Sequence, residues 1–218
     1  MGTIAKQSLR DLAYQEIHEM IENSRFTPGA RINVEELTLE MGVSRTPVWQ
    51  AIGQLEKEGL LYSIPNKGVF MQELSPKEAI DLYSVREVLE CMAAELASLM
   101  IDEGSIGQME ANLAEQRKAI ESGDLVAYSK LDFDFHFAVY RSTANGYLID
   151  LLHDIKKRMR PMVQQMNTIL PELYQDHLTI LGALKNRDAP AAKEGFRTHN
   201  ERMKQLILKS IKTRSADE

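Results

Sequence analysis

The sequence has little of what characterises extracellular and membrane proteins. Cys91 is the only cysteine among 218 residues, which excludes an intrachain disulfide and a metal site built on a cysteine cluster. No stretch approaches the roughly 18 apolar residues that a membrane-spanning helix needs. The first residues, MGTIAKQSLRDL, lack the apolar core of a secretory signal. We therefore expect a cytoplasmic protein with no membrane partner.

An excess of basic residues is also missing. The formal net charge is −6 at pH 7, and residues 1–73 hold 7 Lys and Arg against 10 Asp and Glu. A DNA-binding domain is normally basic, so the bulk charge does not by itself predict one. From Met41 to Met71 the balance reverses slightly, with three basic residues against two acidic ones. Any case for DNA binding must rest on where the charges lie.

Hydrophobic residues make up 44% of the chain, which is enough for a packed core. Their spacing, together with the Ser75-Pro76 helix start, predicts a domain of residues 1–73 and a second of residues 74–218. In the first domain the pattern predicts helices over about 8–24, 34–41 and 44–58 and a hairpin of Leu60–Ile64 and Val69–Gln72.

The spacing of apolar residues predicts that the second domain is helical throughout. Its predicted helices cover about 76–101, 105–121, 124–144, 147–168, 171–186 and 189–212. The expected fold class is therefore mainly α. An N-terminal winged helix-turn-helix with a small β-hairpin wing precedes a C-terminal all-α helical bundle.

The predicted helix over 44–58 has two distinct faces. The face expected to pack inward is formed by Val48, Ala51, Ile52 and Leu55. Hydroxyl, amide and guanidinium groups at the other face and at the helix start suit contacts with phosphates and base edges. We expect DNA contacts from Ser44, Arg45, Thr46, Trp49 and Gln50, and from Lys67 and Gly68 at the tip of the hairpin.

These segments resemble the winged-helix domain of GntR-type bacterial regulators over nearly all of residues 8–72. The likeness is carried by Pro28-Gly29, Glu36-Leu37, Met41 to Val48, Leu55-Glu56, Glu58 to Leu60 and Asn66 to Gly68. The resemblance implies binding to double-stranded operator DNA. Two positions depart from the family, because Glu35 and Trp49 stand where many members carry an operator-binding arginine.

One aspartate and three histidines form a pattern in the second domain. Asp132 and His136 are four residues apart and share a helix face. His177 and His199 are equally distant from the turn expected at residue 188, so two antiparallel helices would hold both imidazoles at the same height. Such a set suits Zn, Ni, Fe or Mn better than Mg or Ca. An octahedral ion would keep two open positions, whereas a tetrahedral zinc would be closed. The alternative is that each histidine is an ordinary polar helix residue.

The second domain also resembles the all-helical FCD effector domain of the FadR-like branch of GntR regulators, over about residues 76–212. The likeness is carried by Asp132 to His136, Asn145, His177, Ala183, Asp188, Ala192 and His199. In the metal-binding members an Asp, a His four residues later and two further histidines hold a divalent ion. The resemblance therefore implies that Asp132, His136, His177 and His199 are metal ligands.

Two further residues are candidates for binding an effector. Arg86 matches an arginine common in the first effector-domain helix, where a guanidinium could hold a carboxylate through two hydrogen bonds. The alternative is an ion pair with Glu90, one helical turn away. Asn145 either lines the effector pocket or ends its helix together with Gly146.

We therefore expect a transcription regulator, and by resemblance a repressor, rather than an enzyme. It would bind operator DNA as a homodimer, because paired half-sites match paired recognition helices. A small organic acid bound at the metal would control operator affinity.

Two alternatives remain open. One is a metal-dependent hydrolase or lyase fused to a DNA-binding module, since an open metal site can activate water. The other is a winged helix used for protein contacts, which its acidic balance would suit.

Overall fold

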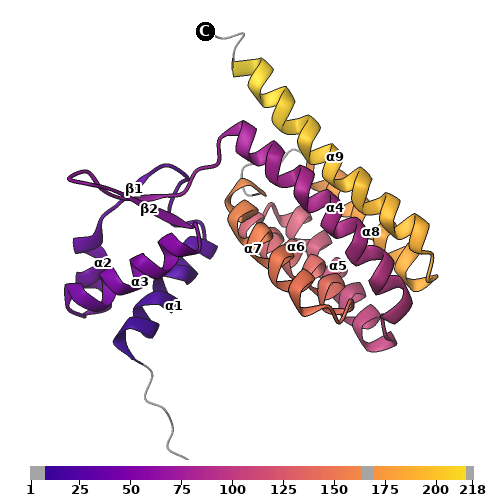
Figure 1. Ribbon diagram of the computed structural model, residues 1–218, viewed down its shortest axis with the longest axis horizontal. Coiled ribbons are helices and arrows are strands. Elements are labelled where there is room, and N and C mark those ends of the chain that lie inside the picture. Colours follow the sequence, from indigo (N-terminus) through magenta and orange to yellow (C-terminus); the bar gives the residue numbers. More distant parts are fainter. Residues whose placement is uncertain (1–7, 164–168, 215–218) are drawn as a thin grey trace, which may run out of the picture. The chain divides into compact units, whose positions relative to one another are not determined.

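The computed structural model describes residues 8–163 and 169–214 (Figure 1). The chain divides into two compact units, unit 1 (Met1–Glu73) and unit 2 (Leu74–Glu218). The last five residues of the helix expected over 147–168 lie outside the described residues. No helix of the described part is long and apolar enough to cross a membrane.

Unit 1 combines three helices with a small sheet within its described residues. The helices are α1 (Leu9–Glu22), α2 (Val34–Met41) and α3 (Arg45–Lys57), and the strands are β1 (Arg31–Ile32), β2 (Leu61–Ile64) and β3 (Gly68–Met71). The predicted hairpin is confirmed, with β2 and β3 antiparallel and Leu61 opposite Met71. The sequence did not predict β1, which pairs with the other side of β3. Two residues are too short to show a strand periodicity, so β1 depends on its partner strand.

The core of unit 1 consists of apolar side chains. The inward face of α3 packs as expected, because Val48, Ala51, Ile52 and Leu55 are each fully buried. Gly42 ends α2 in the left-handed conformation, with φ 62°. The turn between α2 and α3 is therefore as tight as a helix-turn-helix requires.

The described residues of unit 2 form a bundle of helices (Figure 1). The helices are α4 (Pro76–Met100), α5 (Glu103–Ser122), α6 (Leu125–Arg141), α7 (Gly146–Val163), α8 (Leu170–Lys185) and α9 (Ala189–Arg214). The expected capping box opens α4, where Ser75 Oγ accepts from the Glu78 backbone and the Glu78 carboxylate accepts from the Ser75 backbone. The mainly α fold class is confirmed.

A layer of polar side chains divides the core of unit 2. Buried apolar residues form two clusters, one around Phe135 and Phe196 and one around Tyr128 and Met203. Along each of the six helices, polar residues fall between members of the two clusters. They are Arg86 and Glu90, Gln116, Asp132 and His136, Lys156, Asp176 and His177, and His199 and Asn200. The candidate ligands therefore lie inside a continuous polar layer.

Candidate metal centre and nucleic-acid interface

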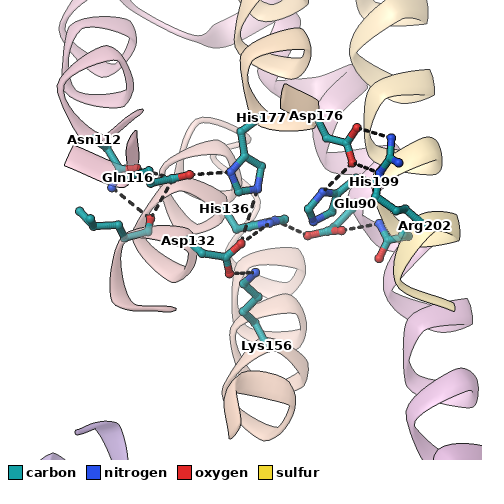
Figure 2. A network of polar contacts seen from close by, with 12 residues as sticks. Glu90, Asn112, Gln116, Asp132, His136, Lys156, Asp176, His177, His199 and Arg202 are labelled. Carbon is teal, nitrogen blue, oxygen red and sulfur yellow. Dashed lines mark hydrogen bonds and ion pairs between the residues drawn. The ribbon is translucent and has the colours of Figure 1, made fainter. Parts of the chain in front are cut away.

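Asp132, His136, His177 and His199 converge in this layer (Figure 2). The four side chains are buried, and one ligand atom of each lies within 4.8 Å of the others. Asp132 and His136 occupy successive turns of α6. His177 on α8 and His199 on α9 face each other across the hairpin, with ring centroids 5.0 Å apart. The geometry is that of a site which could hold a metal ion.

A second set of residues orients these imidazoles. His136 Nδ1 donates to Glu90 Oε1 at 2.7 Å, and His177 Nδ1 donates to Gln116 Oε1 at 2.9 Å. The amide nitrogen of Gln116 donates to Asn112 and to a backbone carbonyl, which leaves its oxygen for the histidine. A hydrogen bond at Nδ1 leaves the Nε2 lone pair for a metal. Nε2 of His177 has no other partner among the described residues, whereas Nε2 of His136 also lies 3.3 Å from Nη2 of Arg86.

Unpartnered atoms test whether a metal fits this cluster. Among the described residues, His177 Nε2 is buried and has no hydrogen-bond partner, whereas His199 Nδ1, which also has none, lies 3.6 Å from Asp176 Oδ2. Asp132 Oδ1 lies 3.5 Å from His177 Nε2 and 3.7 Å from His136 Nε2. Buried polar atoms without a partner are rare in folded proteins. A cation beside Asp132 Oδ1 would satisfy Nε2 of His177, so the residues present fit a metal.

Charges in the layer favour the protonation states that a metal requires. Burial would raise the pKa of the Asp132 carboxyl, but the charge of Lys156 brings it below its ordinary value. Burial, together with the charge of Lys156, lowers the pKa of His136 to about 3. Burial also lowers the pKa of His177. These groups are therefore an anionic carboxylate and neutral imidazoles at neutral pH, the forms that ligate metals.

Four residues of this site were not predicted from the sequence. Glu90 was considered only as a partner of Arg86, and Gln116, Lys156 and Asp176 were not considered. Lys156 Nζ donates to Asp132 Oδ2 at 2.6 Å, although it comes from a different helix. A signal for Lys156 existed, because it occupies an inward position on α7 where an apolar residue is expected.

Arg86 contacts residues of this site. Its side chain is buried, and Nη2 contacts Glu90 Oε1 at 3.0 Å and the ring nitrogens of His136 at 3.2 and 3.3 Å. The ion pair with Glu90 that the spacing allowed is therefore formed. Nε of Arg86 has no hydrogen-bond partner among the described residues.

The interpretation that Asn145 ends the preceding helix together with Gly146 is wrong. Helix α6 ends at Arg141, and Asn145 Oδ1 accepts from the Leu148 backbone at 3.2 Å at the start of α7. The side chain therefore caps the following helix. Within the described part of the chain, Asn145 forms hydrogen bonds with Thr143 and Leu148 rather than with the Asp132 cluster.

The expected DNA-contacting residues of α3 form an exposed surface. Ser44, Arg45, Thr46, Trp49 and Gln50 are each exposed. Ser44 occupies the N-cap position, but its hydroxyl makes no capping hydrogen bond. Arg45 Nη2 donates to Glu35 Oε1 at 2.6 Å, and both side chains are more than two-thirds exposed. Glu35 is thus paired with Arg45, the first residue of α3.

Lys67 lies in the turn between β2 and β3, and Gly68 is the first residue of β3. Lys67 is exposed at the tip, and Asn66 before it has φ 62°. Gly68 has φ 111°, and a Cβ there would lie 2.9 Å from Nε of Arg31 on the adjacent strand. Gly68 is therefore required by the shape of the wing, whatever it contacts.

Two protein-family models match the chain in succession. The model described as bacterial regulatory proteins, gntR family, matches residues 9–71, and the FCD domain model matches residues 81–202. The HTH-type transcriptional regulator YdhC of Bacillus subtilis is 30% identical over 85% of each chain. The HTH-type transcriptional repressor RspR of Escherichia coli is 26% identical over 97% of this chain and 93% of its own.

Solved structures of regulators share the fold. The structure of E. coli McbR/YncC matches 94% of this chain and 99% of its own, with a TM-score of 0.82 and 20% sequence identity. These similar proteins are transcription regulators rather than enzymes. That finding removes the basis for a hydrolase or lyase.

Proposed function

The chain belongs to the GntR family of bacterial transcription regulators and carries an FCD effector domain, and we propose that it is a homodimeric repressor controlled by a small acid at a metal site. The observation that carries this proposal is the buried convergence of Asp132, His136, His177 and His199. Repression is favoured by the likeness to RspR, which is described as a repressor.

Unit 1 would bind operator DNA through α3 and the wing. Members of the family bind operator DNA, and the exposed face of α3 carries the hydroxyl, amide and guanidinium groups that contact phosphates and bases. Lys67 would add a phosphate contact at the tip of the wing. The contacting set proposed is Ser44, Arg45, Thr46, Trp49, Gln50, Lys67 and Gly68.

A homodimer is supported by an apolar stripe on α4. Val85, Val88, Met92 and Leu99 follow one another at intervals of three, four and seven residues, and each is about half exposed or more. Residues at this spacing share one face of a helix. A second copy packed on this face would cover the stripe and pair two recognition helices for a two-fold operator.

Asp132, His136, His177 and His199 would hold a divalent ion, namely Zn, Ni, Fe or Mn. When bound, the ion would offer open coordination positions to a carboxylate. Glu90 and Gln116 would keep the imidazoles of His136 and His177 in place. Arg86 would place a second positive group beside the bound acid.

Helix α4 would link the acid to DNA binding. The helix begins three residues after unit 1 ends, carries Arg86 and Glu90 in the polar layer, and bears the exposed apolar stripe. A change in the polar layer would therefore act on a helix that also belongs to the dimer face. The acid can weaken DNA binding only if it binds the free and DNA-bound forms unequally.

Metal analysis and a DNA-binding titration test the proposal. We expect about one divalent ion per wild-type chain and a loss of that ion in His177→Ala, while His153→Ala retains it as a control within the same unit. Binding to the DNA upstream of the protein's own gene should weaken by about 5- to 150-fold when the active acid is added. Equal metal content in wild type and His177→Ala would refute the metal site. Operator affinity unaffected by a screen of organic acids would refute the sensing mechanism.

A further inference from the structure

Lys156 occupies a position on α7 that packing alone would give to an apolar residue. It lies between Leu152 and Met159, which belong to the two apolar clusters, and its side chain is 4% exposed. Burying an ammonium group costs several kcal/mol unless the group is well paired. A lysine here therefore indicates a role for its charge.

The two oxygens of the Asp132 carboxylate have different neighbours (Figure 2). Oδ2 accepts from Lys156 Nζ at 2.6 Å, whereas Oδ1 faces Nε2 of His136 and His177. A metal in the histidine cluster would therefore find one oxygen of Asp132 free and the other held by the lysine. The ammonium group and the metal position lie on opposite oxygens of the same carboxylate.

The buried charges of the polar layer balance before any metal is bound. Within the described residues, the carboxylate of Glu90 pairs with Arg86 and that of Asp132 pairs with Lys156, and all four side chains are buried. Two negative charges thus meet two positive ones, while Asp176 pairs with the partly exposed Arg202. A divalent ion on neutral imidazoles would leave two positive charges without compensation, in a layer where uncompensated charge is costly.

Buried donors near Asp132 also lack acceptors. The hydroxyls of Tyr83, Tyr128 and Ser129 and the Nε of Arg86 have no hydrogen-bond partner among the described residues. Tyr128 lies one helical turn before Asp132 on α6, and the guanidinium carbon of Arg86 lies 5.5 Å from the centroid of the Tyr83 ring. These donors would be satisfied by an anionic acceptor between them.

We propose that the effector is a small dicarboxylate, with one carboxylate at the metal site and the other held by the Lys156 ammonium and the hydroxyls of Tyr83 and Tyr128. This inference rests on the metal site of the proposed function. A dianion matches the two uncompensated charges, whereas a monocarboxylate matches one. Two separate acidic groups suit a metal and an ammonium that occupy separate oxygens of Asp132. Phosphate concentrates its charge on one centre.

Calorimetric titration of the nickel-loaded full chain tests this inference. The ligands are malonate, succinate and glutarate, each compared with the monocarboxylate of the same carbon number, and inorganic phosphate. We expect the best dicarboxylate to bind at least tenfold more tightly than its matched monocarboxylate and than phosphate. In Lys156→Met that preference should fall below threefold, because the long apolar side chain keeps the packing but removes the charge. Lys130→Met, which removes an exposed lysine from α6, should retain the full preference.

Each outcome decides the question. Equal binding of dicarboxylates and monocarboxylates by the wild type, equally tight binding of phosphate, or a preference that survives in Lys156→Met overturns the inference and leaves the metal site intact. Failure of the wild type to take up nickel or another divalent ion overturns the proposed metal site, and this inference with it. If circular dichroism shows that Lys156→Met is unfolded, the wild-type comparison of matched acids decides alone.

Discussion

Unit 1 and unit 2 differ in the kind of side chain that they bury. Among the described residues, every buried polar or charged side chain lies in unit 2, and the buried residues of unit 1 are apolar or proline. Unit 1 keeps its polar groups on the surface, where α3 and the wing can meet DNA. Unit 2 places them inside, where they can meet only a molecule that enters. The difference separates a surface for a large partner from an interior site for a small one.

The largest expected effect comes from removing Glu90. Its carboxylate accepts hydrogen bonds from Arg86, His136, Tyr140 and Asn200. Burial would raise the pKa of Glu90, but the charges of Arg86 and His136 hold it well below its ordinary value. Glu90→Ala leaves the arginine charge buried and unpaired. The free energy of unfolding of unit 2 should therefore fall by about 3–5 kcal/mol.

Urea denaturation can follow the two units separately. Trp49 is the single tryptophan and lies in unit 1, so its fluorescence reports on unit 1. Far-ultraviolet circular dichroism is dominated by the longer helices of unit 2. The control is Glu95→Ala, which removes an exposed partner of Lys193 from the same helix and should cost less than about 1 kcal/mol. Equal costs for the two variants would contradict the importance assigned to the buried carboxylate.

Acid should also distinguish the two units in the metal-free protein. His136 has an ordinary pKa of 6.5 and a pKa of about 3 when folded. Between these values the unfolded chain binds more protons, so the stabilisation is complete above pH 6.5 and is lost as the pH falls toward 3. The expected slope is about 1.4 kcal/mol per pH unit for each such histidine. His177 should contribute in the same direction.

Thermal melts of chelator-treated protein between pH 7 and pH 5 measure this effect. The circular dichroism transition should move to lower temperature on acidification, while the Trp49 transition moves less, since unit 1 buries no histidine among its described residues. Parallel shifts of the two transitions would show that the buried histidines are not the cause.

The difference between apolar packing and the buried polar layer also explains which features could be predicted from the sequence. Apolar periodicity located the helices because packing on one face imposes that pattern, and capping residues such as Ser75 and Asp188 fix their starts. The four candidate ligands were found because their spacing within a helix and across a hairpin is visible in one dimension. Their placement in one cluster agrees with that spacing.

Spacing along the sequence did not reveal the residues that surround the ligands. Glu90, Gln116 and Lys156 come from α4, α5 and α7, and nothing in their sequence spacing relates them to α6, α8 or α9. Their positions follow from the packing of helices, which brings together distant residues such as Asn200 and Glu90, 110 positions apart. Asn145, which the sequence matched to a family position, caps α7 in the structure.

A smaller effect is expected on the DNA side. Lys67 is exposed at the tip of the wing, so Lys67→Ala should remove one phosphate contact. Removal of one such contact reduces the slope of log affinity against log salt by about one. Lys57→Ala is the matched control, since Lys57 is also exposed but lies in the last turn of α3, away from Ser44 and Gln50. Fluorescence anisotropy on the operator over a series of salt concentrations measures both slopes, and identical slopes would exclude the wing from the interface.

The smallest expected effect tests the exposed pair of Glu35 and Arg45 in unit 1. Glu35 accepts from Arg45 at the start of α3, and both side chains are well exposed. An exposed ion pair contributes no more than about 1 kcal/mol, and a carboxylate beside the DNA surface repels phosphate. Glu35→Gln should therefore increase DNA affinity by no more than about fivefold, with a steeper dependence on salt as Arg45 becomes available to phosphate.

Glu40→Gln is the matched control, because it changes the net charge equally on the same helix but releases Arg25 instead. If both variants raise affinity equally, the effect is one of net charge. If Glu35→Gln weakens binding, the carboxylate itself contributes to recognition by positioning Arg45 or by accepting a hydrogen bond from a base.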